Sequence, residues 1–119
     1  MITEDDPLSR TMLCYLLKDY FPDVHIVKMT QTVRDSMEFL NDHKIDLLFL
    51  DIELPDGKGF DILQSVQNVD FTVIITTSFV KYAQESGSHN ILDWIVKPLT
   101  RPGLEKAMNH FLEIKKSAG

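Results

Sequence analysis

Short apolar runs alternate with helical patterns along the whole chain, and this rhythm constrains the fold more than any other feature of the sequence. The runs are rich in β-branched residues and nearly continuous, which is typical of strands buried on both faces of a parallel sheet. They lie at Val24–Met29, Ile45–Leu50, Thr72–Thr77 and Ile91–Val96, and Met1–Thr3 is a candidate for a fifth strand.

The segments between these runs carry apolar residues at spacings of three and four, the pattern of amphipathic helices. The predicted helices are Leu8–Tyr20, Val33–Asn41, Gly59–Gln67, Val80–Ser88 and Leu104–Lys116. Pro7 precedes the first of them and suits the first helical position. Five strand–helix units predict an α/β fold, a doubly wound five-stranded parallel sheet with helices on both faces and right-handed crossovers.

Length and composition agree with one domain over residues 1–119. The chain is 44% hydrophobic and 25% charged, and its net charge of −6 disfavours binding to nucleic-acid phosphates. The single cysteine, Cys14, excludes an intrachain disulfide and is typical of a reduced intracellular protein. No apolar run approaches the roughly 18 residues of a membrane span, and the start of the chain lacks a secretory signal. We therefore expect a cytoplasmic location and no membrane contact.

In doubly wound folds the ligand site lies at the carboxyl ends of the strands, so the residues that follow each run are candidates for a site. Acidic residues follow the first and third strands, hydroxyls end the fourth, and a lysine follows the fifth. In chain order these residues are Glu4, Asp5, Asp6, Asp51, Thr76, Thr77, Ser78 and Lys97. The topology therefore predicts carboxylates, a hydroxyl and an amine at one edge of the sheet.

The acidic residues allow two interpretations. Carboxylates between a strand and a helix often cap the helix, and for Glu4–Asp6 alone this explanation is as good as a site. Asp51 ends a large apolar run, where an isolated carboxylate is costly unless it is paired or bound to metal. Clustered carboxylates attract a hard cation such as Mg²⁺ and leave one carboxylate as a nucleophile toward phosphorus. The pattern therefore favours phosphoryl transfer to a carboxylate, with a lysine and a hydroxyl neutralising the phosphoryl oxygens.

Four segments together resemble the receiver domain of two-component response regulators, over nearly the whole chain. They are Glu4-Asp5-Asp6-Pro7, LLFLDIELPDGKGFDIL at 47–63, IITTS at 74–78 and VKP at 96–98. The resemblance implies a flavodoxin-like, CheY-like fold and a signalling switch rather than an enzyme, with at most slow self-phosphorylation and dephosphorylation. It also implies a cis peptide bond between Lys97 and Pro98.

The resemblance assigns the acidic residues to a phosphorylation site. Asp51 matches the phospho-acceptor. Mg²⁺ would be held by Asp5, by Asp51 and by the backbone carbonyl of Glu53, with Glu4 acting through water.

The remaining matched residues belong to the switch. A histidine kinase would donate the phosphoryl group, Lys97 would pair with the acyl phosphate, and Thr77 would move toward it. Trp94, the switch aromatic, would then turn inward. Phosphorylation would bias an existing two-state equilibrium.

The type of output is also indicated. Pro7-Leu8-Ser9-Arg10, Tyr82-Ala83 and the run from Leu92 to Pro98 resemble receivers joined to a LytTR-type DNA-binding domain. Such a C-terminal domain is not part of this sequence, so DNA would be bound only through it. The prediction is therefore control of transcription.

Receivers of this type pair through the face of the fourth helix, fifth strand and fifth helix. In this chain that face would draw on Tyr82, Ser86, Asp93, Arg101, Lys106, Asn109 and His110. Because the set is mostly polar, we expect a monomer in dilute solution and a homodimer on phosphorylation.

Other functions fit the sequence less well. An FMN protein of the flavodoxin type needs a phosphate-binding loop after the first strand, where Glu4-Asp5-Asp6 would repel the phosphate. A phosphatase of the haloacid dehalogenase type needs a second aspartate where Glu53 stands, and no nucleotide-binding glycine pattern occurs. The serious alternative is a stand-alone receiver-fold interaction module or a phosphorelay intermediate without DNA-binding output.

Overall fold

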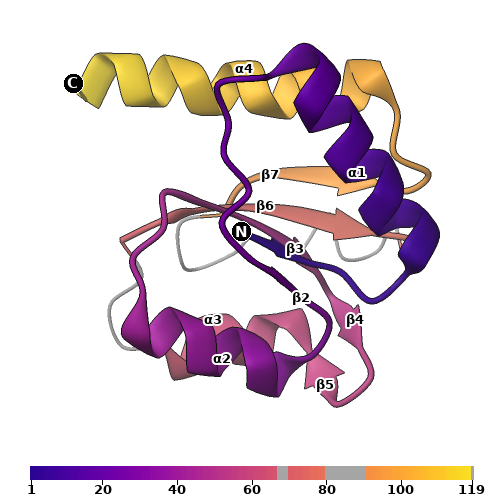
Figure 1. Ribbon diagram of the computed structural model, residues 1–119, viewed down its shortest axis with the longest axis vertical. Helices are drawn as coiled ribbons and strands as arrows, with labels where there is room; N and C mark the ends of the chain where they lie inside the picture. Colours follow the sequence, from indigo (N-terminus) through magenta and orange to yellow (C-terminus); the bar gives the residue numbers. More distant parts are fainter. Residues whose placement is uncertain (67–69, 80–90, 119) are drawn as a thin grey trace.

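A computed structural model describes residues 1–66, 70–79 and 91–118 of the chain (Figure 1). Its main sheet has five parallel strands in the order β2-β1-β3-β6-β7. They are β1 (Ile2–Thr3), β2 (Met29–Thr30), β3 (Leu47–Asp51), β6 (Thr72–Thr77) and β7 (Ile91–Val96). The helices are α1 (Pro7–Tyr20), α2 (Val33–Asp42), α3 (Gly59–Ser65) and α4 (Arg101–Ala118). The predicted doubly wound α/β fold is confirmed.

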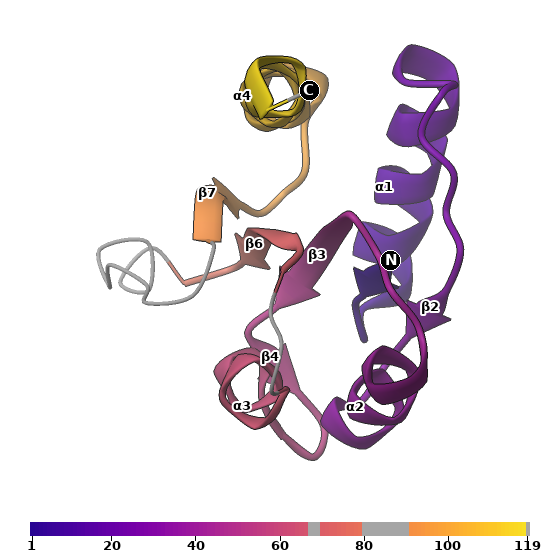
Figure 2. The same cartoon turned by 90° about the vertical axis from the view of Figure 1, so that its left-hand side faces the viewer.

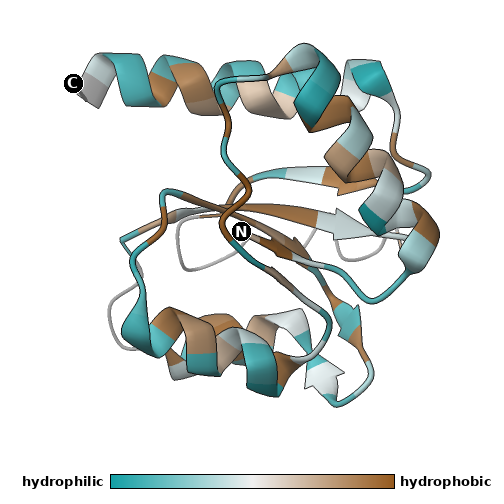
Figure 3. Cartoon of the chain, viewed as in Figure 1, coloured by the Kyte–Doolittle hydropathy of each residue, from teal (hydrophilic) through white to brown (hydrophobic). Residues whose placement is uncertain are grey.

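The helices cover the sheet in two layers, with α1 and α4 on one face and α2 and α3 on the other (Figures 1 and 2). Strand side chains alternate between these layers. In β3, Leu48 and Leu50 pack in the cluster that includes α2 and α3, whereas Leu47 and Phe49 pack in the cluster that includes α1 and α4. Figure 3 shows the hydrophobic residues gathered on the central strands, which explains why these runs are continuous rather than alternating.

Two of the five predicted strands match their predicted bounds, two differ by one or two residues at their ends (β1 and β3), and one is wrong in extent. Thr72–Thr77 and Ile91–Val96 are strands over the predicted ranges. The predicted strand Val24–Met29 is wrong in extent, because only Met29–Thr30 is assigned to β2. The neighbouring β1 pairs only over Ile2–Thr3. The predicted run therefore has a strand partner only at its C-terminal end. The predicted helix Val80–Ser88 lies outside the described residues.

A small antiparallel hairpin of β4 (Glu53–Leu54) and β5 (Gly57–Lys58) follows β3 and was not predicted. The hairpin brings the chain back to the end of β3, where the Gly59 N–H donates to the carbonyl of Ile52 at 2.6 Å. Helix α3 then starts against the end of β3. None of the helices in the described parts of the chain is long and apolar enough to cross a membrane.

Gly59→Ala is expected to destabilise the protein, because a Cβ at this position would lie 2.3 Å from the Asp51 carbonyl oxygen. The added methyl would have to displace backbone rather than a flexible side chain, at a cost of roughly 1 to 3 kcal/mol. Urea unfolding would measure the loss. Gly103→Ala in α4 is the control, since its Cβ meets only the Thr100 hydroxyl at 3.2 Å and Ile95 at 3.8 Å. Equal stabilities for the two variants would contradict this packing argument.

Candidate functional site

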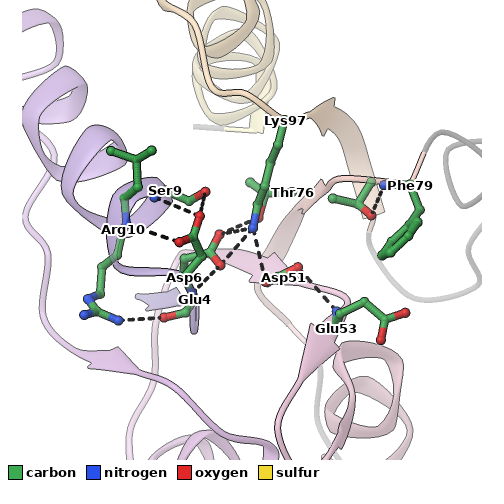
Figure 4. A network of polar contacts seen from close by, with 11 residues as sticks. Glu4, Asp6, Ser9, Arg10, Asp51, Glu53, Thr76, Phe79 and Lys97 are labelled. Atoms are coloured by element: carbon green, nitrogen blue, oxygen red, sulfur yellow. Dashed lines mark hydrogen bonds and ion pairs between the residues drawn. The ribbon is translucent and has the colours of Figure 1, made fainter.

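Three charged side chains meet at the carboxyl edge of the sheet (Figure 4). The Lys97 Nζ lies 2.8 Å from Glu4 Oε1 and 3.2 Å from Asp51 Oδ2. All three are withdrawn from solvent: Glu4 is 1% exposed, Asp51 is 6% exposed, and the Lys97 side chain is 10% exposed. The chain therefore buries two carboxylates around one amine.

The sheet topology explains why these residues meet. Thr3 of β1 is paired with Leu50 of β3, so Glu4 and Asp51, the next residues in each strand direction, lie side by side. Lys97 directly follows β7, and its N–H donates to the Thr77 carbonyl at 2.7 Å. The Lys97–Pro98 peptide bond is cis, as predicted from the resemblance.

The electrostatics of the cluster follow from burial and from the proximity of the two carboxylates. The pKa of Glu4 is raised to about 7, chiefly by desolvation and further by its hydrogen bond with Asp51, while Lys97 opposes both effects. Burial opposes the charge on Lys97, but its contacts with Glu4 and Asp51 raise its pKa above the ordinary value. The site therefore holds more negative charge than one lysine neutralises once Glu4 is ionised.

Without metal, the stability of the protein should fall as the pH rises from about 4.5 to about 7. The pKa of Glu4 is about 7 in the folded protein, against 4.5 as its ordinary value, so the folded state holds a proton that the unfolded chain has released. The expected loss is roughly 2 to 3 kcal/mol. Urea unfolding at pH 5 and pH 8 would measure it, with Glu4→Gln as the control that lacks this titration. Parallel pH dependences of the two proteins would contradict the prediction.

The three consecutive acidic residues after β1 have three different environments. Glu4 is buried, and besides Lys97 its carboxylate accepts the Thr76 hydroxyl at 3.4 Å. Asp5 is exposed to solvent. Asp6 caps α1, since its carboxylate accepts the N–H groups of Leu8 and Ser9 at 3.3 Å. The capping interpretation thus holds for Asp6, whereas Glu4 belongs to the buried cluster.

The ion pair between Glu4 and Lys97 was not foreseen from the sequence. The resemblance gave Glu4 a role through water and gave Lys97 an acyl phosphate as its partner. The only signal in the sequence was the position of Glu4 directly after the first apolar run.

The side chains of the two predicted switch residues make contacts outside the cluster of Glu4, Asp51 and Lys97. Thr77 is fully buried, and its hydroxyl accepts the N–H of Phe79 at 3.0 Å. Trp94 of β7 is partly buried, with its ring centroid 6.1 Å from that of Phe60 in α3. Trp94 therefore packs on the α2–α3 side of the sheet.

The residues predicted for Mg²⁺ fit a hard cation by their chemistry, since all of them offer oxygen. The Glu53 carboxylate is paired with Lys58, while its N–H donates to Asp51 Oδ1 at 3.3 Å. Within the described ranges, no three His, Cys, Asp or Glu side chains are grouped closely enough to hold a metal. The predicted set needs no such trio, because it uses two carboxylates, a backbone carbonyl and water.

A sequence profile of the response regulator receiver domain matches residues 1–109, and the chain belongs to this family. Among curated proteins it is similar to the sensory transduction protein LytT of Enterococcus faecalis, with 36% identity over 82% of this chain and 41% of that protein. The sensory transduction protein LytT of Bacillus anthracis is 30% identical over 98% of this chain and 48% of that protein. The chain thus spans less than half the length of these relatives.

Solved structures show the same fold. The response regulatory domain of protein mrkE from Klebsiella pneumoniae has a TM-score of 0.79 and 24% identity, over 94% of this chain and 96% of that chain. A mutant form of the anti-anti-sigma factor PhyR from Bartonella quintana has a TM-score of 0.84 and 21% identity, over 98% of this chain and 49% of that chain. The resemblance to the LytTR type of receiver agrees with the curated relatives.

Proposed function

We propose that residues 1–119 form a single receiver domain that accepts a phosphoryl group on Asp51 from a histidine kinase. The observation that carries the proposal is the contact of Lys97 Nζ with both Glu4 and Asp51 in a buried cluster. One lysine balances the charge of one carboxylate, whereas this cluster holds two carboxylates. The second carboxylate leaves a negative charge that an incoming cation can neutralise. Asp51 is the carboxylate at the end of the central strand, and Glu53 N–H orients one of its oxygens.

In the proposed reaction, a carboxylate oxygen of Asp51 attacks the phosphorus of a phosphohistidine. A P–O bond forms, the P–N bond breaks, and the imidazole leaves with the bonding electron pair and takes up a proton. Mg²⁺, held by Asp5, Asp51 and the Glu53 carbonyl, would neutralise charge on the phosphoryl oxygens when bound. Lys97, already 3.2 Å from Asp51, is placed to pair with the acyl phosphate.

The switch residues would then respond to the negative charge of the phosphoryl group on Asp51. Thr77 would exchange its hydrogen bond with Phe79 N–H for one to the phosphoryl group. Trp94 would change its packing against Phe60, and with it the surface of β7 and α4. Phosphorylation can shift this equilibrium only by its differential affinity for the two states, typically about 1 to 3 kcal/mol.

The output proposed is control of transcription through a C-terminal DNA-binding domain of the LytTR type. It is supported by relatives named transcriptional regulatory protein LytR, at 29% identity, of which the chain spans 45%. In the proposed dimer face, Asp93 and His110 approach each other at 4.0 Å, and Arg101 pairs with Glu105. Tyr82 and Ser86 of that face lie outside the described residues.

Phosphorylation of the protein by acetyl phosphate should require Mg²⁺, and Asp5→Asn should weaken Mg²⁺ binding. A neutral amide replaces one negative oxygen ligand, so the Mg²⁺ concentration for half-maximal labelling should rise by about 10-fold or more. Intact-mass measurement over a Mg²⁺ series would show this. Asp19→Asn, at an exposed position on α1 away from the cluster, is the control. Labelling without divalent metal would overturn the proposed chemistry and favour the stand-alone interaction module.

A further inference from the structure

Strand β2 ends the sheet on one side, and no strand among the described residues pairs with its outer edge (Figure 2). The N–H groups of Ile2 and Glu4 donate to the carbonyls of Lys28 and Thr30, each at 3.0 Å. Alternate residues of a strand direct their backbone groups to opposite sides. The N–H and C=O of Met29 therefore point away from β1, toward the outer edge.

A groove of about 590 Å³ runs between this edge and α2. One wall is formed by Lys28 to Thr32, which include β2, and the other by Asp35, Glu38 and Phe39 of α2. The Lys28 Nζ lies 5.7 Å from the centre of the Phe39 ring. Along the same edge, Val27 is 60% exposed and Met29 is 48% exposed. The edge therefore has outward-pointing backbone N–H and C=O groups, exposed apolar side chains and charges of both signs.

We propose that this edge is a self-association surface, on which the β2 strands of two copies of the chain pair antiparallel about a two-fold axis. Met29 would face Met29 of the second copy and exchange two backbone hydrogen bonds with it. A two-fold interface needs a surface that complements itself. The groove meets this condition because the cation of Lys28 lies on one wall and the carboxylates of Asp35 and Glu38 lie on the other. Glu38 is also paired with Arg34 at 3.4 Å on the exposed surface of α2. The two-fold axis turns each Lys28 toward the carboxylates of the second copy.

This contact is distinct from the proposed phosphorylation-dependent dimer. Strands β2 and β7 lie at opposite ends of the strand order, so the two surfaces do not overlap. The Met29 edge does not involve Asp51, and the contact should form without phosphate. Short edge strands with a lysine limit edge pairing, so the association is weak, with a Kd on the order of 0.1 to 1 mM.

Sedimentation equilibrium up to about 1 mM protein tests the proposal. Wild-type protein should show a monomer–dimer equilibrium that Mg²⁺ with beryllofluoride does not abolish. Lys28→Glu should raise the Kd about 10-fold, because each of two symmetric contacts becomes repulsive. Adding Glu38→Lys to this variant should restore the wild-type Kd, because the positive and negative charges at positions 28 and 38 are then exchanged. Lys116→Glu, the same charge change at an exposed lysine of α4 that belongs to neither dimer surface, should leave this Kd unchanged.

A backbone variant tests the strand pairing independently of charge. Met29→Pro removes the outward N–H while keeping the ladder bonds of Lys28 and Thr30, and it should abolish the dimer. Its urea unfolding would show that the fold is intact; if it does not fold, the charge-exchange pair decides. A monomer at every concentration, or equal effects of Lys28→Glu and Lys116→Glu, would overturn the proposal. Because no arm depends on labelling of Asp51, failure here is separate from failure of the proposed phosphorylation.

Discussion

Asp51→Asn is expected to lower phosphorylation by acetyl phosphate with Mg²⁺ to below about a hundredth of the wild-type rate. The amide lacks the negative oxygen that would attack phosphorus. The substitution also removes one of the two buried carboxylates next to Lys97 and leaves the ion pair with Glu4 in place. Stability should therefore be unchanged or higher, which separates loss of the reaction from loss of the fold. Intact-mass measurement with a urea unfolding curve would check both.

Asp46→Asn is the matched control for this experiment. The Asp46 side chain is 78% exposed and pairs with Lys115 at 3.1 Å. It should be labelled like the wild-type protein. Undiminished labelling of Asp51→Asn, or a peptide map that places the phosphoryl group on Asp5, would refute Asp51 as the acceptor.

Lys97→Ala should lower both stability and switching. It leaves Glu4 and Asp51 buried beside each other without their cation, and breaking a buried ion pair in this way costs about 3 to 5 kcal/mol. The loss should be smaller at pH 5 than at pH 8, because Glu4, with its pKa raised to about 7, then carries a proton. Labelling of Asp51 should persist at a reduced rate, while the activated conformation fails to form.

Two measurements separate these effects. Urea unfolding at pH 5 and pH 8 reports the stability, with Lys106→Ala on α4 as the exposed control. Trp94 fluorescence with beryllofluoride and Mg²⁺ reports the switch. A normal fluorescence response in a folded Lys97→Ala protein would show that the lysine has a structural role only.

Most of the sheet could be predicted because its longer strands carry enough apolar and β-branched residues to be recognised in the sequence. Thr72–Thr77 and Ile91–Val96 consist almost entirely of apolar and β-branched residues and find partners along their length. The extent of β2 could not be predicted, since a strand extends only as far as its neighbour pairs with it, and β1 pairs over two residues. The hairpin of β4 and β5 was missed because each of its strands has only two residues, too few for a periodic pattern.

The site was predictable to the level of which strands carry it, but not to the level of contacts. The convergence of Glu4, Asp51 and Lys97 follows from parallel topology, because all three come at the carboxyl ends of strands. Which of the consecutive residues Glu4, Asp5 and Asp6 turns inward depends on side-chain packing around each one. That information is tertiary, and no spacing in the sequence contains it.

The bond between Lys97 and Glu4 joins residues that are 93 positions apart. It can form only after nearly the whole chain has been brought together, so the closing of this loop must precede the ion pair. Until then, Glu4 and Asp51 on neighbouring strands have no lysine to offset their charge, and burying them early would be unfavourable. Withdrawal of the carboxylates from water and arrival of the lysine are therefore coupled in one late step. We therefore expect the contacts among Glu4, Asp51 and Lys97 to form together during folding rather than one at a time.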